Sequence, residues 1–295
     1  MQRFLSMTDA RDVLAPATTM GAVTLAVADL DTMVAYYRGG VGLDLLAEEG
    51  GRASLGRNGR TALVLEQRAE LRHASPSQAG LYHTAFLFAD QADLAASVYS
   101  VATRYGGSFT GSSDHLVSKA LYFDDPEGNG VELYWDRPRD EWRWRGGSVE
   151  MGTVFLDPNR FLAENLTDTG AEAGPSGDAG VGHVHLKVGD IATAKAFYVD
   201  TLGFEVTAAF GDSALFVSAG GYHHHLGMNT WHSAGAGTRT PALGLGQVSV
   251  TVPAADDLGA LRERLTARRI GQRDTGDAVT FEDPWANTVR VTVGA

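Results

Sequence analysis

Two stretches of the chain decide its fold: GAVTLAVADLDTMVAYYRGGVGLDLL at residues 21–46 and GHVHLKVGDIATAKAFYVDTLGFEV at residues 182–206. Each begins with an alternating apolar strand and passes through an aspartate into a helix that carries a pair of aromatic residues. Each then reaches a glycine turn before a new strand. The two stretches align almost without gaps, so the chain contains an internal repeat.

Two weaker copies complete the repeat, at residues 81–106 and 245–270. They again give a strand, an acidic helix start and an amphipathic helix, and they close with the related endings FDDPEGNGVELYW (123–135) and FEDPWANTVRVTV (281–293). Each copy leaves room for about three further strands joined by hairpin turns. The pattern therefore predicts an α+β fold of four βαβββ modules, whose equivalent first-strand positions are Ala22, His83, His183 and Gln247.

The modules fall into two halves separated by a segment of different composition. We expect an N-terminal extension at residues 1–20, modules 1 and 2 at residues 21–136, and modules 3 and 4 at residues 181–295. The segment between them, residues 137–180, is aromatic and then helical, and we expect it to pack against the first half. Its end, NLTDTGAEAGPSGDAG at residues 165–180, lacks apolar periodicity and predicts a flexible linker.

Composition limits the chemistry that the chain can perform. The 295 residues include no cysteine and nine histidines, and the net charge is −12. The absence of cysteine excludes disulfides, cysteine–zinc sites, iron–sulfur clusters and a thiol nucleophile. Catalysis must therefore come from histidines, carboxylates and hydroxyls.

Charge and hydropathy also indicate where the protein acts and with what. An acidic chain without a basic block repels phosphate backbones, which disfavours nucleic acid and anionic membrane as partners. The start, MQRFLSMTDARD, has no apolar core of signal-peptide length, and no window approaches about 18 apolar residues, so we expect a cytoplasmic protein. Sheet edges and the aromatic stretch at residues 135–144 favour a homo-oligomer.

Four βαβββ modules with the turn DPEGNGVELYW resemble the vicinal oxygen chelate superfamily, and the resemblance covers nearly the whole chain after residue 20. It implies that pairs of modules form two open cups of eight strands. It also implies that metal ligands come from the first and last strands of each module. The last-strand positions are about Glu66, Glu132, the stretch near Leu226, and Arg290.

The pairing of modules decides which residues could hold a metal. If neighbouring modules pair, the first cup offers Glu66, His83 and Glu132, a set that would suit a Lewis-acid site of the glyoxalase or isomerase kind. If the two middle modules pair, one cup offers His83, Glu132 and His183, and the outer cup is almost empty of ligands. We prefer the second partition because it gives one complete set. Two histidines and a carboxylate leave three positions of an octahedral ion open, which suits Fe(II), with Mn(II) as the alternative.

Three consecutive histidines in the run YHHHLGM, residues 222–228, are candidate acid–base groups, and a histidine cluster exposed in a loop is the alternative interpretation. Strand alternation would send His223 and His225 to one face and His224 to the other. The run resembles type I extradiol ring-cleaving dioxygenases, in which a histidine just before an aliphatic strand is an acid–base group at the oxygen site. By that match His224 is the candidate and His225 the alternative.

A second segment carries the same resemblance: DHLVS at residues 114–118, followed by Tyr122 and, ten residues later, Glu132. The resemblance implies that Tyr122 and His115 hydrogen-bond the substrate oxygens, whereas a half-buried strand aromatic is the plainer interpretation of Tyr122. Trp231, after the histidine run, fits either a substrate wall or core packing.

These motifs together are similar to those of bacterial two-domain extradiol dioxygenases of the catechol 2,3-dioxygenase kind. The resemblance implies a non-haem metal enzyme that opens the ring of a small aromatic diol next to the hydroxyl groups, with O2 as the second substrate. Two alternatives stay open on the same scaffold. One is a metal-dependent glyoxalase or isomerase-like lyase, and the other is a metal-free protein that binds an aromatic drug.

Overall fold

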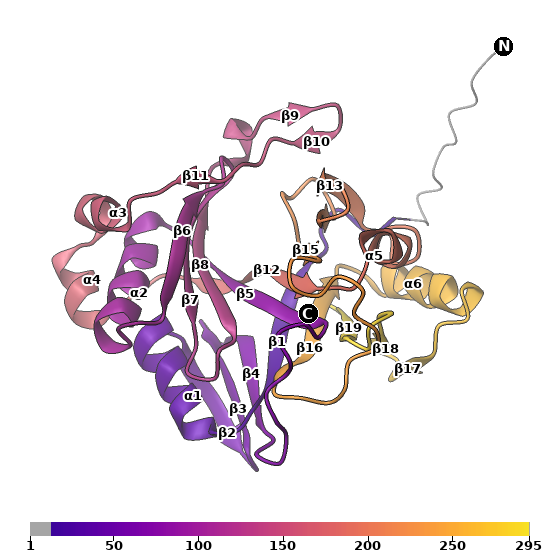
Figure 1. The fold of residues 1–295 in the computed structure, drawn as a ribbon, viewed down its shortest axis with the longest axis horizontal. Helices are drawn as coiled ribbons and strands as arrows, with labels where there is room; N and C mark the ends of the chain where they lie inside the picture. Colours follow the sequence, from indigo (N-terminus) through magenta and orange to yellow (C-terminus); the bar gives the residue numbers. More distant parts are fainter. Residues whose placement is uncertain (1–12, 295) are drawn as a thin grey trace.

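The computed structural model describes residues 13–294, and residues 1–12 of the predicted N-terminal extension lie outside this range. The strands form two large sheets, one of eight and one of nine strands, with helices on their outer sides (Figure 1). We call them the outer sheet and the inner sheet. A separate two-stranded hairpin completes the strands of the described residues.

The outer sheet combines the first and last modules. Module 1 contains β1 (Thr19–Val27), α1 (Leu30–Tyr36), the short π-helix η1 (Tyr37–Val41), β2 (Asp44–Glu49), β3 (Arg52–Arg57) and β4 (Arg60–Gln67). Module 4 contains β16 (Gly244–Val252), α6 (Ala255–Ala267), β17 (Gln272–Asp274), β18 (Ala278–Glu282) and β19 (Thr288–Val293). The strand order is β17-β18-β19-β16-β1-β4-β3-β2, so β1 and β16 join the two modules.

The inner sheet combines the two middle modules. Module 2 contains β5 (Gly80–Phe88), α2 (Gln91–Arg104), β6 (Phe109–Asp114), β7 (Ser118–Asp124) and β8 (Gly130–Asp136). Module 3 contains β12 (Ala179–Lys187), α5 (Ile191–Tyr198), β13 (Glu205–Phe210), β14 (Ala214–Ser218) and β15 (Leu226–Asn229). The order is β11-β6-β7-β8-β5-β12-β15-β14-β13, with β5 and β12 antiparallel at the junction.

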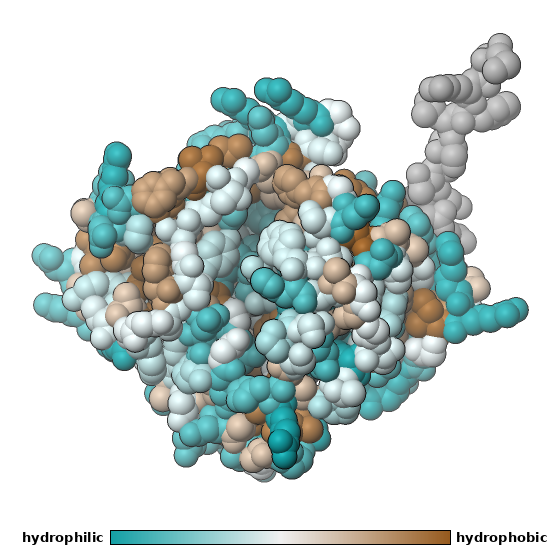
Figure 2. Space-filling model, viewed as in Figure 1, coloured by the Kyte–Doolittle hydropathy of each residue, from teal (hydrophilic) through white to brown (hydrophobic). Residues whose placement is uncertain are grey.

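This topology confirms the predicted pairing of the middle modules. In every module the first strand lies parallel to the last strand, as β5 does to β8 and β12 to β15. The inner sheet differs from the expected eight strands because the segment between the halves adds β11 (Val154–Phe155) beside β6. Figure 2 shows hydrophobic side chains gathered in the region of β11, where Phe155 is 82% exposed. An exposed apolar edge suits association with another chain, and the homo-oligomer stays a prediction.

Aspartates begin the helices because their carboxylates accept hydrogen bonds from otherwise unpaired backbone N–H groups. Asp29 accepts from the N–H of Thr32 at 3.0 Å, and Asp90 and Asp190 cap α2 and α5 in the same way. Module 4 has Ala254 at this position and no side-chain cap from it. The aspartate of the repeat therefore sets the start of three of the four module helices.

The second aromatic residue of the repeat links the two sheets. The Tyr37 hydroxyl of module 1 donates to Asp125 Oδ2 of module 2 at 2.9 Å. The Tyr198 hydroxyl of module 3 donates to Asp283 Oδ2 of module 4 at 2.8 Å. Both aspartates belong to the Asp-Pro turn that precedes the last strand of a module, so the same contact is made twice between repeated elements.

The segment between the halves packs against the first half, as expected. It contains η2 (Arg139–Glu141), β9 (Trp144–Arg145), β10 (Ser148–Val149), β11, α3 (Pro158–Asn165) and α4 (Asp168–Ala173). Helices α3 and α4 lie beside α2 (Figure 1). The stretch predicted as a flexible linker differs from expectation: it forms α4, and the Asp93 carboxylate accepts the N–H groups of Ser176 and Gly177 at 2.7 and 3.0 Å.

Side chains of the central strand β12 alternate between a hydrophobic core, which both sheets share, and a cavity on the other face of the inner sheet. Val184 and Leu186 of β12 are buried in one hydrophobic cluster with Val23 and Leu63 of the outer sheet. His183 and His185 point to the opposite face of β12, because successive side chains alternate. Among residues 13–294, no helix is long and apolar enough to cross a membrane.

Candidate metal centre

Strand register places the three predicted metal ligands together. Ala85 on β5 lies opposite Glu132 on β8 and opposite His183 on β12, so these three residues form a row across the inner sheet. His83 is two residues before Ala85 and therefore shares its face. The small Ala85 side chain leaves the space between the larger groups open.

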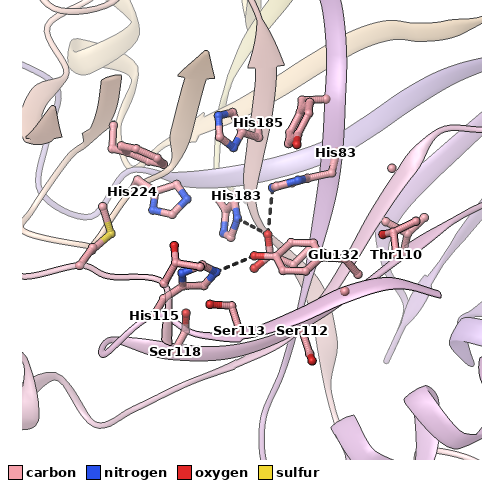
Figure 3. Close-up of a pocket in the computed structure, with 18 of the residues that line it drawn as sticks. His83, Thr110, Ser112, Ser113, His115, Ser118, Glu132, His183, His185 and His224 are labelled. Atoms are coloured by element: carbon pink, nitrogen blue, oxygen red, sulfur yellow. Dashed lines mark hydrogen bonds and ion pairs between the residues drawn. The ribbon is translucent and has the colours of Figure 1, made fainter. Parts of the chain in front are cut away.

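The ligand atoms of this trio converge on one point, as Figure 3 shows. His83 Nε2 lies 2.9 Å and His183 Nε2 3.1 Å from the same oxygen, Glu132 Oε2. The three residues offer ligand atoms that all lie within 4.8 Å of one another. All three side chains are buried, with 2–6% of each residue exposed.

The arrangement fits a metal ion better than a hydrogen-bonded cluster. His83 Nε2 is buried and has no aligned hydrogen-bond partner, although the Glu132 oxygen is only 2.9 Å away. Neighbouring ligands of an octahedral ion with bonds of about 2.1 Å are about 3 Å apart, which matches both measured distances. Two imidazole nitrogens and one carboxylate form a donor set suited to Fe(II) or Mn(II).

Electrostatics keep these groups in the protonation state that a metal requires. Burial alone would raise the pKa of the Glu132 carboxyl, but the neighbouring His183 and His83 outweigh it and hold that pKa well below its usual range. Burial lowers the pKa of His183 despite the opposing attraction of Glu132. The site therefore presents an ionised carboxylate beside a neutral imidazole.

A cavity of about 680 Å³ opens above the trio. Its walls come from β5, β6, β7, β8, β12, β13 and β14, that is, from both modules of the inner sheet. Serine and threonine residues of β6 and β7 line the cavity (Figure 3), and so do several aromatic residues. The volume lies in the range typical of small-molecule sites.

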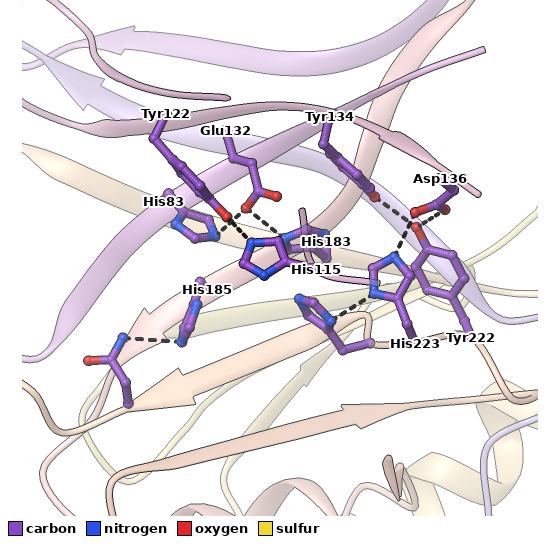
Figure 4. A network of polar contacts seen from close by, with 12 residues as sticks. His83, His115, Tyr122, Glu132, Tyr134, Asp136, His183, His185, Tyr222 and His223 are labelled. Carbon is purple, nitrogen blue, oxygen red and sulfur yellow. Dashed lines mark hydrogen bonds and ion pairs between the residues drawn. The ribbon is translucent and has the colours of Figure 1, made fainter. Parts of the chain in front are cut away.

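The structure brings together the predicted pair His115 and Tyr122. His115 Nδ1 lies 2.7 Å from the carbonyl of Gly152, and His115 Nε2 lies 2.6 Å from the Tyr122 hydroxyl (Figure 4). Because a carbonyl only accepts, a neutral His115 carries its hydrogen on Nδ1 and accepts from Tyr122 at Nε2. Tyr122 also lies directly opposite Glu132 in the β7–β8 pair, so its oxygen faces the trio.

The three consecutive histidines do not follow strand alternation. They lie in a bend before β15 begins at Leu226, and not in the strand that the sequence predicted. His223 and His225 both pack against the Tyr222 ring, with centroids 4.2 and 5.0 Å away. His223 and His224 are hydrogen-bonded neighbours, with their Nδ1 atoms 2.8 Å apart. His224 lines the cavity. His225, the alternative acid–base candidate, faces away: its Nδ1 accepts the N–H of Ala219 at 3.2 Å.

Sequence reasoning did not identify several of the residues that line the cavity. His185 stacks edge-on against Tyr82 and lies beside Trp231, with ring centroids 5.1 and 5.6 Å apart. Asn229 Nδ2 lies 3.1 Å from His185 Nε2, and burial lowers the pKa of His185 well below its usual range. His185 could have been found from the sequence, because it is two residues after His183 in one strand. Trp231 is 50% exposed and lines the cavity, which favours the wall over core packing.

The alternative ligand set is not assembled. Glu66 lies on β4 of the outer sheet, where it pairs with Arg52 at 3.0 Å and is partly exposed. The two groups of described residues that could hold a metal both include His183, and neither includes Glu66. His83, Glu132 and His183 thus meet in the cup formed by the inner sheet, which we call the inner cup, as the preferred pairing of modules predicts.

Four βαβββ modules with two histidines and a carboxylate across the central strands define a protein of the vicinal oxygen chelate class. The chain belongs to the Glyoxalase/Bleomycin resistance protein/Dioxygenase superfamily, whose model matches residues 19–133 and 180–291. It is 35% identical over 272 residues to the catechol-2,3-dioxygenase of Bacillus subtilis (strain 168), with 90% of this chain and 94% of that protein covered.

Solved structures of this fold include proteins named for different activities. A Bacillus subtilis protein assigned as a dioxygenase superimposes with a TM-score of 0.62 at 15% identity, covering 93% of this chain and 85% of that chain. Glyoxalase I from Zea mays superimposes with a TM-score of 0.57 at 17% identity, covering 94% and 92%. At these identities the likeness shows the fold alone, so the reaction must be argued from the site.

Proposed function

We propose that this protein is a metal-dependent extradiol dioxygenase, which opens the ring of a small catecholic substrate next to its two hydroxyl groups with O2. One observation carries the proposal: the convergence of His83, Glu132 and His183 at the floor of a cavity that also contains acid–base groups and an aromatic wall. The curated relative named catechol-2,3-dioxygenase supports the same reaction class.

The trio would hold the metal, for which we propose Fe(II), with Mn(II) as the alternative. When bound, such an ion supplies a chelation point for two vicinal oxygens and the redox chemistry that O2 requires. The trio lies at the floor of the cavity, so an ion held there would be accessible to a substrate bound in the cavity. A diol with adjacent hydroxyls fits such an ion better than a single alcohol.

Residues around the trio have roles in proton transfer and orientation. His224 lines the cavity beside His183, with ring centroids 4.1 Å apart, and would exchange a proton with the substrate oxygens. Burial and the nearby His183 and His223 hold the pKa of His224 well below its usual range, so it is a neutral base near pH 7. The Tyr122 oxygen has lone pairs free to accept a hydrogen bond from a substrate hydroxyl, because its own hydrogen is directed to His115.

The aromatic wall would orient the ring of the substrate. Tyr82 contacts His185 and Trp231 edge-on, and the rings of His185 and Trp231 are tilted relative to each other, at centroid distances of 5.1–5.6 Å. All three line the cavity together with Phe216. Such rings favour a flat apolar ligand through edge and face contacts. They would also exclude water from the reacting side of the cavity.

Anaerobic reconstitution tests the proposal. Metal-free protein would be loaded with Fe(II) or Mn(II) without oxygen, analysed for metal content, and mixed with catechol and O2 while the yellow ring-opened semialdehyde is followed by absorbance. We expect about one metal ion per chain and turnover. His183→Ala should lose both, whereas Glu66→Gln, the matched control for the alternative ligand set, should keep both.

Two results would contradict the proposal. Stoichiometric metal without turnover of any vicinal diol would indicate a lyase or isomerase on the same scaffold. Retention of full metal affinity by His183→Ala would show that the ligands are not those of the inner cup.

A further inference from the structure

A chain of hydrogen bonds runs from His224 at the cavity into the protein. Figure 4 shows the part of it that joins His223, Asp136 and Tyr222. His224 Nδ1 lies 2.8 Å from His223 Nδ1, and His223 Nε2 lies 2.8 Å from Asp136 Oδ1. His223 is fully buried and is packed against the rings of Trp142 and Tyr222. It does not line the cavity, so the substrate site does not account for it.

The direction of each hydrogen bond in this chain follows from the Asp136 carboxylate, because a carboxylate only accepts hydrogen bonds. The second oxygen of Asp136, Oδ2, lies 2.7 Å from the Tyr222 hydroxyl, which donates to it. Burial and the Asp136 charge raise the pKa of Tyr222 well above its usual range, so this hydroxyl keeps its hydrogen. Tyr134 lies 2.8 Å from Tyr222 and must be the donor of that pair, because the Tyr222 hydrogen is already used.

The same reasoning fixes the hydrogen on each histidine. A carboxylate only accepts, so His223 carries a hydrogen on Nε2, and in the neutral ring its Nδ1 is then an acceptor. The hydrogen between the two rings must therefore come from His224 Nδ1. A neutral His224 with hydrogen on Nδ1 has a free lone pair on Nε2.

We propose that Asp136 and His223 are positioning residues that hold His224 in the Nδ1–H tautomer, so that its Nε2 lone pair accepts a proton from the bound substrate. This rests on the proposed function in that His224 contacts the substrate. The arrangement is an Asp–His pair that acts on a second histidine and not on a nucleophile. In such pairs the carboxylate fixes the tautomer, and an amide in its place costs up to about 10⁴-fold in rate.

Nuclear magnetic resonance of metal-free protein labelled with ¹⁵N-histidine tests the tautomer directly. The signals of His224 are assigned by their loss in His224→Gln. We expect the wild-type protein to show His224 protonated at Nδ1. Asp136→Asn replaces one acceptor oxygen by a donor amide, which allows His223 to carry its hydrogen on Nδ1, so a population of His224 with hydrogen on Nε2 should appear.

Kinetics of the metal-loaded enzyme give a second readout. Asp136→Asn should lower kcat at least tenfold while KM and metal content change less than about threefold. Tyr222→Phe is the matched control, because it removes a hydrogen bond to the same carboxylate and leaves the His223 contact intact; its kcat should stay within about threefold of wild type. A merely structural Asp136 would give similar losses in both variants.

The tautomer measurement stands apart from the proposed reaction. A wild-type His224 protonated at Nε2 overturns the inference even if the enzyme cleaves catechol. An unchanged tautomer in Asp136→Asn also overturns it. Failure to turn over any diol, with the Nδ1–H tautomer observed in the wild type, contradicts the proposed function and leaves the assigned hydrogen-bond order in place. The wild-type spectrum decides the tautomer even if Asp136→Asn does not fold.

Discussion

A variant of Tyr122 can distinguish an effect on substrate binding from an effect on metal binding. Its hydroxyl is 2.6 Å from His115 Nε2, and Tyr122 lies opposite Glu132 in the β7–β8 pair. Burial and the Glu132 charge raise the pKa of Tyr122 well above its usual range, so it is a neutral hydrogen-bonding group. We expect Tyr122→Phe to lower kcat/KM for catechol by about 10²-fold, with metal content by elemental analysis unchanged.

The control for this variant is Tyr99→Phe on α2, outside the cavity, which should behave as the wild type in the same assay. Loss of metal in Tyr122→Phe would show that the hydroxyl supports the ligand geometry. Its place in the mechanism would then have to be abandoned.

At the residue scale, the sequence predicted the convergence of His83, Glu132 and His183 better than it predicted the conformation of the histidine run. The trio could be found because the repeat places His83, Glu132 and His183 at equivalent strand positions. The run at 223–225 could not, because Gly220 and Gly221 adopt left-handed backbone (φ 63° and 67°) and turn the chain before the strand begins. The run therefore lies in a turn and not in the strand that the sequence predicted.

Among the elements, the repeated tyrosine contact joins a helix of one sheet to a turn of the other. The Tyr37 hydroxyl donates to Asp125, whereas the hydroxyl of its neighbour Tyr36 is buried and has no hydrogen-bond partner among residues 13–294. Tyr37→Phe should lower the free energy of unfolding by about 1.5–3 kcal/mol, the usual range for a hydrogen bond to a charged group. Tyr36→Phe is the matched control and should leave it unchanged or slightly higher, as measured by urea unfolding.

The effect of Tyr37→Phe should depend on pH. Burial raises the pKa of the Asp125 carboxyl to about 6, although hydrogen bonds from Asn129 and Tyr37 partly oppose the rise. The Asp125 carboxyl ionises near pH 3.8 in the unfolded chain but only near pH 6 in the folded chain. As pH rises through this interval, the free energy of unfolding therefore falls by about 3 kcal/mol in total. The Tyr37 hydroxyl stabilises the ionised form.

The loss in Tyr37→Phe should therefore be larger at pH 7.5 than at pH 4. Urea unfolding of wild type and variant at both pH values measures this difference. An equal loss at the two values would show that the hydroxyl does not act through the charge of Asp125.

Residues 165–180, predicted as a flexible linker, show that local composition cannot reveal contacts with distant parts of the chain. The glycines and acidic residues of this stretch predict flexibility, but the residues that hold it in place lie on α2 and β3. Asp93 of α2 accepts two of its N–H groups, and Arg57 of β3 donates to the carbonyls of Pro175 and Gly177. Such contacts between distant segments order a stretch that has little structural preference of its own.

For the whole molecule, the site requires both halves of the chain. Glu132 and His83 come from module 2, His183 comes from module 3, and the two modules meet only after the connector brings β12 back beside β5. The sequence predicted that modules 2 and 3 pair, because this pairing brings His83, Glu132 and His183 into one cup. Pairing of neighbouring modules would divide the three residues between two cups. The cavity walls could not be predicted, because β11 and the segment around Met151 and Gly152 join the inner cup from outside the repeat.

Metal binding should therefore stabilise the whole chain and not one module. Any ligand that binds only the folded state at 100 times its Kd adds about 2.7 kcal/mol to the free energy of unfolding. For a chain of 295 residues that corresponds to a rise in Tm of about 4 °C. We expect Fe(II) or Mn(II), added without oxygen, to raise the Tm of the metal-free wild type by this amount in a single transition followed by circular dichroism. His183→Ala should show no rise, since the ion would lose the ligand that module 3 contributes. A rise confined to one of two separate transitions would mean that the ion is held within one half, against the arrangement in which β5, β8 and β12 share it.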